Sequence, residues 1–207
     1  MNTKTLFLFF LFATLCCSSL PAEESPQSVL DRESSGTLEP FKSDPNIEKQ
    51  LGPSTRFAGY SISPPRGYVQ VLPPEAPAAT QFAGWVGTRR TDGSTPMIQV
   101  TVFTPPAQGE TPELTENIVR MLLAGVKRRR TNWTETETVY GTIGGIPFAQ
   151  KKWKGKDKAT GTEMRGTMFI GLDGAKIIQL HTQDLVAHPE AIQLGESSLM
   201  TFARKEP

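Results

Sequence analysis

The chain has 207 residues, 37% of them hydrophobic, and a formal net charge of +1. This length suits one ordinary domain with appendages, since domains commonly run to roughly 100–200 residues. Its two cysteines, Cys16 and Cys17, stand near the amino end, so the rest of the chain can form no disulfide, thiolate nucleophile or cysteine-ligated zinc site.

Residues 1–22 have the pattern of a secretory signal peptide. A short n-region precedes an apolar run at 6–15, and small residues then lead to Ala22. The run is too short for an ordinary membrane span. We therefore expect cleavage after Ala22 and export to the periplasm or the cell exterior. A lipidated Cys16 or Cys17 is the alternative, and a single acyl chain would hold the protein at a membrane only peripherally.

Residues 23–54 are expected to form a disordered acidic tether. They carry three basic side chains against seven acidic ones and are rich in Glu, Ser, Pro, Asp and Gly. Such a composition cannot bury enough apolar surface to offset the entropy of ordering the chain. A short docking piece near FKSDPNIEKQL is the one exception we allow. Residues 55–207, with eighteen basic and fourteen acidic side chains, are predicted to form a single, mildly basic domain.

The first half of this domain is predicted to contain short strands. They are expected near 60–62, 67–72, 82–89 and 97–103. In the last of these, MIQVTVF, the residues Ile98, Val100 and Val102 share one wholly aliphatic face. We expect that face to lie in the core.

A helix is predicted from Thr111 to the run KRRR. Thr111 can cap it, Pro112 suits the first helical position, and Glu113 favours the positive end of the helix dipole. Apolar residues then recur at helical spacing and should form one buried stripe. They are Leu114, Ile118, Met121, Leu122, Gly125 and Val126.

After this helix the pattern returns to strands, expected at 135–143, 146–155, 162–172 and 175–183. They are linked by a GG pair, a polar KDKATG turn and the dipeptide Asp173-Gly174, which indicates a tight two-residue hairpin. Pro189 then opens a final helix whose apolar face holds Ala191, Leu194, Gly195, Ser198, Leu199 and Phe202. A sheet covered by amphipathic helices defines an α+β domain.

Four segments of this domain are similar to those of a known family. They are GYSISPP near the start, GTIGGIPF before the strand FAQKKW, the hairpin RGTMFIGLDGAKIIQLHT, and the terminal helix ending SLMTFAR. Through them, residues 55–205 resemble the PsbP-like superfamily of extrinsic photosystem proteins and their exported bacterial relatives. The resemblance implies a central antiparallel sheet with helices packed on both sides. It also implies a small binding or assembly factor without established catalysis.

A weak hydrolase that uses His181 is an alternative. His181 shares a strand face with Gln179 and Gln183, which we expect to be solvated or covered by a helix. Asp184, three residues on, should point to the opposite face, so the two would not form an orienting pair. His188 is expected to be structural. The sequence has neither the ligand spacing of a metal site nor a phosphate loop, so we expect no cofactor.

Two basic runs, KRRR and KKWKGKDK, contain the main candidates for a binding surface. Lys152, Lys154 and Lys156 are expected on one strand face, with Lys151 and Trp153 on the other. An aromatic ring among cations could hold an anionic polymer or a lipid headgroup. The other interpretation is a solubilising edge strand, whose lysines block edge pairing. The candidate partner-binding residues are Arg128, Arg129, Arg130, Lys151, Lys152, Trp153, Lys154 and Lys156.

We therefore expect an exported, non-enzymatic accessory or binding domain that engages a protein partner or a component of the cell envelope. The alternatives are a binder of anionic lipid or polysaccharide through the lysine-rich strand, and the weak hydrolase. The basic excess of the domain is modest, so nucleic acid is not expected as a partner. We expect a monomer.

Overall fold

The structure is a computed structural model, and it describes residues 38–71, 80–105 and 114–205. Within these ranges the chain forms two sheets and three helices. Several predictions lie outside the described residues: the signal peptide at 1–22 with Cys16 and Cys17, the first part of the tether, and the helix cap at Thr111.

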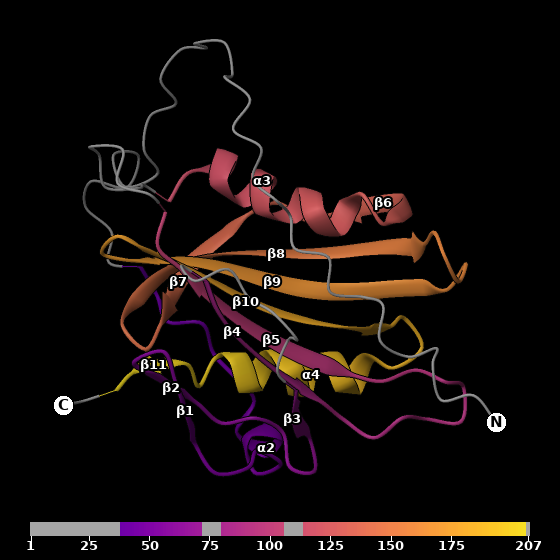
Figure 1. Cartoon of the computed structure of the whole chain (residues 1–207), viewed down its shortest axis with the longest axis horizontal. Coiled ribbons are helices and arrows are strands. Elements are labelled where there is room, and N and C mark those ends of the chain that lie inside the picture. Colours follow the sequence, from indigo (N-terminus) through magenta and orange to yellow (C-terminus); the bar gives the residue numbers. More distant parts are fainter. Residues whose placement is uncertain (1–37, 72–79, 106–113, 206–207) are drawn as a thin grey trace.

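The larger sheet is antiparallel at every described strand pair. Its strand order is β3-β4-β5-β10-β9-β8-β6, and β7 pairs with β8 next to β6. The long strands β8, β9 and β10 lie side by side across the molecule (Figure 1). The strands are β3 (Val69–Val71), β4 (Thr80–Val86), β5 (Met97–Phe103), β6 (Arg130–Glu135), β7 (Val139–Ile143), β8 (Ile146–Asp157), β9 (Glu163–Asp173) and β10 (Lys176–Leu185).

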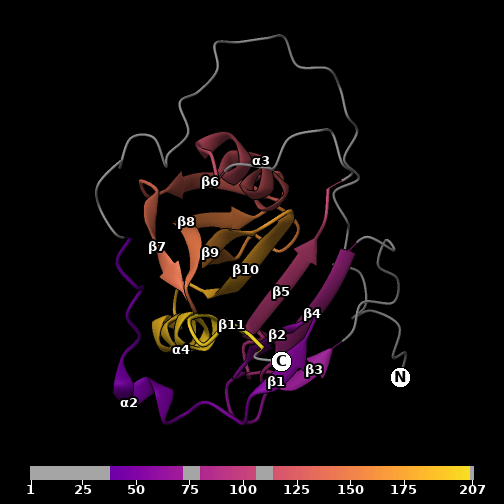
Figure 2. The same ribbon diagram turned by 90° about the vertical axis from the view of Figure 1, so that its left-hand side faces the viewer.

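Helices cover both faces of this sheet. Figure 2 shows α3 (Glu116–Lys127) on one face and α4 (Pro189–Leu199) on the other. The core on the α4 side includes Ile98, Val100, Phe148, Ile178, Leu180 and Leu199. The core on the α3 side includes Val119, Leu123, Ala149, Trp153, Met168 and Ile177. The predicted α+β class, an antiparallel sheet with helices on both sides, is therefore confirmed.

A smaller sheet lies beside the first. It is formed by β1 (Thr55–Phe57), β2 (Tyr60–Ile62) and β11 (Ala203–Arg204), in that order. Tyr60 stacks on Phe202 with ring centroids 4.7 Å apart, and its hydroxyl donates a hydrogen bond to Asp173 (2.7 Å). These contacts hold the smaller sheet against the end of β9 in the larger sheet.

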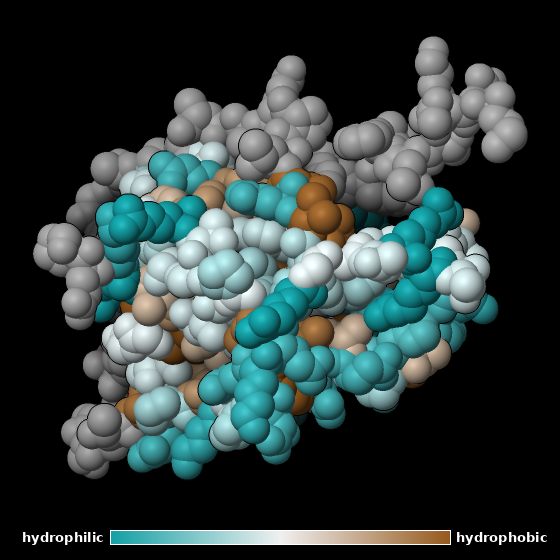
Figure 3. Space-filling view, turned by 90° about the horizontal axis from the view of Figure 1, so that it is seen from below, coloured by the Kyte–Doolittle hydropathy of each residue, from teal (hydrophilic) through white to brown (hydrophobic). Residues whose placement is uncertain are grey.

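The surface is mostly hydrophilic where it is seen from below, and its hydrophobic residues form separate patches (Figure 3). Among the described residues the exposed large hydrophobics are Val69, Met121 and Val139, which belong to three different elements. Single exposed hydrophobic residues are normal and indicate no binding partner. Charged groups are therefore the better guide to a site.

The turns and the β5 face agree with the predictions. Ile98, Val100 and Val102 are buried and alternate with half-buried residues. The GG pair joins β7 to β8 with φ of 56° and 73°, a left-handed backbone that favours glycine. Asp173 pairs with Lys176 across the β9–β10 hairpin, which leaves a loop of two residues.

The helix α3 differs from its prediction at both ends. It begins at Glu116, and its cap is Thr115, whose hydroxyl accepts an amide hydrogen bond from the first turn. It ends at Lys127, and Arg130 already belongs to β6. That strand was not predicted, because RTNWTE has no regular alternation of apolar residues.

The buried face of α3 is also rotated from the predicted stripe. Val119, Leu123 and Val126 are its buried residues, whereas Met121 is 48% exposed. Two apolar series recur at helical spacing in this segment, and packing on the sheet decides which of them faces inward. In α4 most of the predicted face is correct, since the buried residues are Ala191, Ile192, Gly195, Ser197, Ser198 and Leu199.

Residues 38–54 pack on the domain, so the docking piece allowed near FKSDPNIEKQL is present and this part of the chain is not a disordered tether. The Phe41 amide donates to a carbonyl oxygen of β7 (3.0 Å), and the Phe41 ring meets Phe169 edge-on with centroids 5.3 Å apart. The short helix α2 (Pro45–Glu48) follows, and Leu51 is buried. The folded unit therefore includes these residues, and the predicted boundary at residue 55 lies too far along the chain.

Candidate functional site

The strand β8 alternates as predicted. Lys152, Lys154 and Lys156 are exposed, whereas Lys151 and Trp153 are buried on the opposite face. However, β8 is not an edge strand, because it pairs with β9 on one side and with β6 and β7 on the other. The interpretation of these lysines as a device that blocks edge pairing is therefore wrong.

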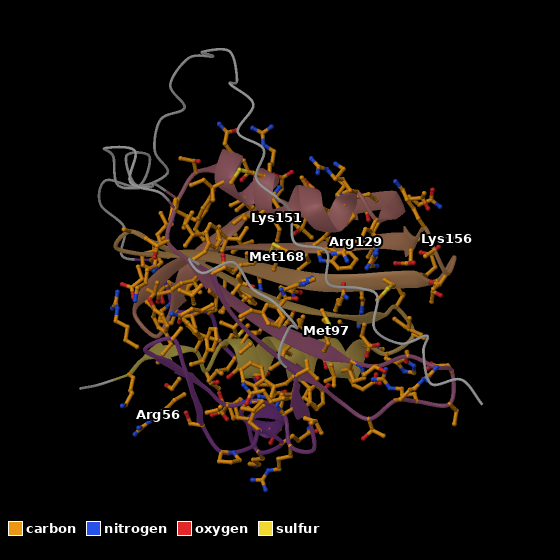
Figure 4. All side chains as sticks on the ribbon, viewed as in Figure 1. Arg56, Met97, Arg129, Lys151, Lys156 and Met168 are labelled. Atoms are coloured by element: carbon orange, nitrogen blue, oxygen red, sulfur yellow. The ribbon has the colours of Figure 1, made fainter. Side chains whose placement is uncertain are left out.

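Lys151 is held by two carboxylates. Its Nζ lies 2.9 Å from Glu116 Oε1 and 3.3 Å from Glu135 Oε1. Burial alone would lower the pKa of Lys151, but the hydrogen bonds and charges of Glu116 and Glu135 outweigh it and raise that pKa. Lys151 lies between α3 and the sheet (Figure 4), so it links these elements and is not available to a partner.

Trp153 belongs to the core rather than to a binding groove, since only 2% of it is exposed. Its ring stacks on Trp133 with centroids 5.2 Å apart and lies 5.9 Å from the ring of His181. The guanidinium carbon of Arg130 is 5.4 Å from the Trp153 centroid. A partner on the surface cannot reach this ring, so Trp153 is not the aromatic element of an anion-binding groove.

Arg130 also points inward and is 8% exposed. Its Nη1 lies 2.6 Å from Asp157 Oδ2, and its Nη2 donates to Gln183 Oε1 at 3.3 Å. Burial lowers the pKa of Arg130, and Asp157 offsets part of that effect. The charge of Arg130 is balanced inside the molecule, where it joins β6 to the end of β8.

Lys152 is exposed but paired. Its Nζ lies 2.9 Å from Glu196 Oε1 on α4. An exposed ion pair of this kind contributes at most about 1 kcal/mol to stability. Lys152 is therefore only weakly held, but a carboxylate already neutralises its charge.

Four of the eight candidate residues are exposed and form no ion pair among the described residues. These are Arg128, Arg129, Lys154 and Lys156. The backbone brings them together, because the Lys158 amide donates to the Arg129 carbonyl oxygen (3.0 Å) and Thr131 stands opposite Lys156 in the β6–β8 ladder. We call these four residues the basic end. Arg129 and Lys156 lie toward the same end of the molecule (Figure 4).

His181 lies on the α3 side of β10 and is 4% exposed. Its Nε2 is buried and has no hydrogen-bond partner in the described structure. Burial, together with the charges of Arg129 and Arg130, lowers the pKa of His181 to about 3. Asp184 lies on the opposite face of the strand, as predicted, where Arg90 binds it at 2.8 Å. His181 therefore has neither an orienting carboxylate nor access to a substrate.

The remaining histidine, His188, is paired with a carboxylate, and a cavity lies beside α4. His188 Nε2 lies 2.8 Å from Asp92 Oδ2, and hydrogen bonds from His188 and Ser94 lower the pKa of that carboxyl. A cavity of about 330 Å³ lies between α2 and α4, lined in part by Tyr68 and Arg90. Burial and the charge of Asp184 raise the pKa of Tyr68 to about 12.

Two other kinds of site are not found in the part of the chain that the structure describes. No three His, Cys, Asp or Glu side chains there gather so that they could hold a metal ion. No helix within 38–71, 80–105 and 114–205 is both long and apolar enough to span a bilayer.

Arg165 is a residue that the sequence alone does not single out, and the structure places it beside the basic end. It is half-buried and stands directly opposite Lys154 in the β8–β9 ladder. Like the basic end, it forms no ion pair with any described residue. The KDKATG turn is the signal that could have found it, because the turn fixes which residues of a hairpin face each other.

Comparisons of the sequence with known proteins find no relative: no family model matches the chain, and neither does any curated protein. Solved structures resemble it. LpqN of Mycobacterium tuberculosis, involved in cell envelope biogenesis, is 15% identical with a TM-score of 0.48, and the match covers 85% of this chain and 96% of LpqN.

Two further solved structures are similar. The cyanobacterial PsbP (CyanoP) of Synechocystis is 11% identical with a TM-score of 0.49, covering 79% of this chain and 91% of CyanoP. The Ran-binding protein Mog1p of Saccharomyces cerevisiae is 12% identical with a TM-score of 0.49, covering 73% of this chain and 94% of Mog1p. A PsbP, the family that the sequence resembles, is thus among the similar structures. At these identities and TM-scores the likeness says nothing of what this chain does.

Proposed function

We propose that this protein is a non-catalytic binding domain that engages an anionic partner through the basic end. One observation carries the proposal. The four residues of the basic end are exposed without ion pairs to described residues, whereas the neighbouring Lys151, Lys152 and Arg130 are all paired. Because carboxylates of the fold neutralise these three cations and not the four of the basic end, an external anion is the natural complement of the basic end.

The surroundings of His181 support a binding role over a hydrolytic one. General acid–base catalysis needs a side chain within hydrogen-bond reach of the substrate. His181 is enclosed beside Trp153, and the carboxylate nearest to it in sequence lies on the other face of the sheet. A hydrolase built on His181 would require the core to open.

A protein with an acidic surface is the first candidate for the partner. Arg128 and Arg129 follow the end of α3, whereas Lys154 and Lys156 lie on the α4 side of β8. A partner that contacts all four must follow the surface around the end of the sheet, as side chains of a second protein can. An anionic lipid or polysaccharide is the second candidate, favoured by the position of the lysines near the exposed β8–β9 turn.

Capture of partners from a cell-envelope extract tests the proposal. The purified chain should retain an anionic partner. The double variant Lys154→Glu/Lys156→Glu should bind that partner at least about tenfold more weakly, because its new carboxylates would repel the anionic groups of the partner. Both lysines are exposed. Lys154→Glu places a carboxylate opposite Arg165 and Lys156→Glu places one opposite Glu163, so the two effects on stability oppose each other and the unfolding temperature should change little.

The matched control is Lys42→Glu/Arg56→Glu, which makes the same change in net charge at exposed residues away from the basic end (Figure 4 labels Arg56). It should capture the partner as the wild type does. Equal capture by all three proteins would contradict the proposal. Equal loss in both variants would mean that net charge, and not the basic end, controls binding.

We also propose that the protein is exported, on the strength of the signal-like pattern of residues 1–22. Sequencing the amino terminus of the protein recovered from its own cells checks this. A chain that begins at Glu23 supports cleavage after Ala22, a lipid-modified start at Cys16 or Cys17 supports anchoring, and a chain that retains Met1 contradicts both.

A further inference from the structure

An arginine outside the basic runs lies beside the lysines of the basic end. Arg165 in β9 stands directly opposite Lys154 of β8 and Asp184 of β10. Side chains opposite each other in an antiparallel ladder have Cβ atoms roughly 4.5–5.5 Å apart. Arg165 and Lys154 are therefore neighbours of like charge, an arrangement that is unfavourable unless an anion lies between them.

The carboxylates next to Arg165 do not neutralise it. Asp184 is buried and bound by Arg90 through both nitrogens, with Nη1–Oδ1 at 3.0 Å and Nη2–Oδ2 at 2.8 Å. Glu163 is exposed opposite Lys156, and it forms no ion pair with a described residue. Arg165 is thus left without an acceptor in the described structure.

The guanidinium of Arg165 is partly enclosed. Its Nε is buried and has no hydrogen-bond partner among the described residues, while the side chain as a whole is only half-buried. Packing around Nε limits the freedom of the side chain before a ligand arrives, which favours binding. Of the three nitrogens of Arg165, only Nε is both buried and without a hydrogen-bond partner, and a guanidinium presents its N–H groups as a planar fork that matches the oxygens of a phosphate.

We propose that Arg165, Lys154 and Lys156 form a site for a phosphate group, with Arg165 as its anchor. The inference rests on the proposed function and specifies a phosphate group as the anion that Lys154 and Lys156 of the basic end bind. A phosphate monoester carries a charge of about −1.5 to −2 and three acceptor oxygens at neutral pH, so it can accept from Arg165 and Lys154 together. Inorganic phosphate and a lipid headgroup share this chemistry.

Titration of the ¹⁵N-labelled chain with inorganic phosphate at constant ionic strength tests the site. Amide signals of residues 154, 156 and 165 should shift and saturate, and the same ionic strength of sodium chloride should not move them. The variant Arg165→Lys keeps the positive charge but lacks the planar guanidinium that can donate two parallel hydrogen bonds, so its affinity for phosphate should fall about tenfold. Equal shifts with chloride, or equal affinity in the variant, would overturn the inference.

The matched control is Arg56→Lys, the same substitution at an exposed arginine of β1, away from the basic end (Figure 4). It should bind phosphate as the wild type does. The source of the phosphate is decided by sedimentation with phosphatidate vesicles, using phosphatidylcholine vesicles as the blank. Vesicle binding that Arg165→Lys weakens to the same degree supports a lipid headgroup, whereas phosphate binding without vesicle binding supports a soluble phosphate compound.

The two proposals fail in different ways. If Lys154→Glu/Lys156→Glu loses its partner but the wild type binds no phosphate, the basic end is a binding surface of another chemistry and only the phosphate site is overturned. If phosphate binds at Arg165 but partner capture does not depend on the lysines, the phosphate site stands and the proposed function fails.

Discussion

At the scale of single residues, His181 makes the stability of the fold depend on pH. It is enclosed beside Trp153, and burial is the main cause that lowers its pKa to about 3, with Arg129 and Arg130 adding to the effect. The folded protein therefore keeps this ring neutral. In the unfolded chain its pKa returns to about 6.5.

We predict that His181 makes the protein less stable as the pH falls from about 6.5 toward 3. In this window the unfolded chain binds a proton that the folded chain excludes, so the free energy of unfolding falls by up to about 1.4 kcal/mol per pH unit. Urea unfolding at several pH values from about 7 to about 4, a range within which the effect should appear, measures how steeply the free energy of unfolding changes with pH.

The control for this prediction is His181→Phe, which fills the same buried position without a titrating group. The variant should lose this part of the pH dependence, whatever its stability at pH 7. Carboxylates such as Asp173, whose pKa is lowered by its hydrogen bond with Arg204, remain in both proteins and cancel in the comparison. The same slope in both proteins would show that His181 can be protonated in the folded state.

At the scale of elements, the contact of α4 with β10 depends on Gly195. A Cβ at this position would lie 2.1 Å from Thr182 Oγ1 and 2.9 Å from Thr182 Cβ. We predict that Gly195→Ala lowers the free energy of unfolding by about 1–3 kcal/mol, because the helix must move away from a closely packed sheet. Thermal or urea unfolding measures the change.

Gly125 of α3 provides the matched control, since a Cβ there would have no atom within 4 Å. Gly125→Ala should raise the free energy of unfolding by about 0.5–1 kcal/mol, because alanine is the better helix former. If both substitutions were stabilising to the same degree, α4 would not be docked as closely as described.

Elements with a simple hydrophobic period could be predicted from the sequence, and those without it could not. The alternation of apolar and polar residues in β5 and β8 correctly predicted their buried and exposed faces, and the glycine-containing turns correctly predicted the hairpins. In β6 the register shifts between Thr131 and Thr134, and Asn132 has a φ of 50°, so no period of two is visible there. Residues 38–54 are polar in composition, so only a short docking piece near FKSDPNIEKQL was expected there, and the packing depends on a few contacts such as that of Phe41 with Phe169.

At the scale of the whole molecule, the sequence located the cations but could not tell which of them are neutralised. The carboxylates that pair with Lys151, Lys152 and Arg130 come from other elements, or from strand ends far along the chain. Only the fold brings them together. Arg165 was missed for the same reason, because its place next to Lys154 depends on the register of a hairpin.

The salt dependence of the complex between the chain and its captured partner tests the central claim most directly. We predict that the wild-type dissociation constant rises steeply as sodium chloride increases, because salt at about 0.1 M already screens exposed charges beyond roughly 10 Å. The variant Lys154→Glu/Lys156→Glu should bind weakly at low salt and change little. An affinity that is independent of salt and equal in both proteins would contradict the claim and place the partner on another surface.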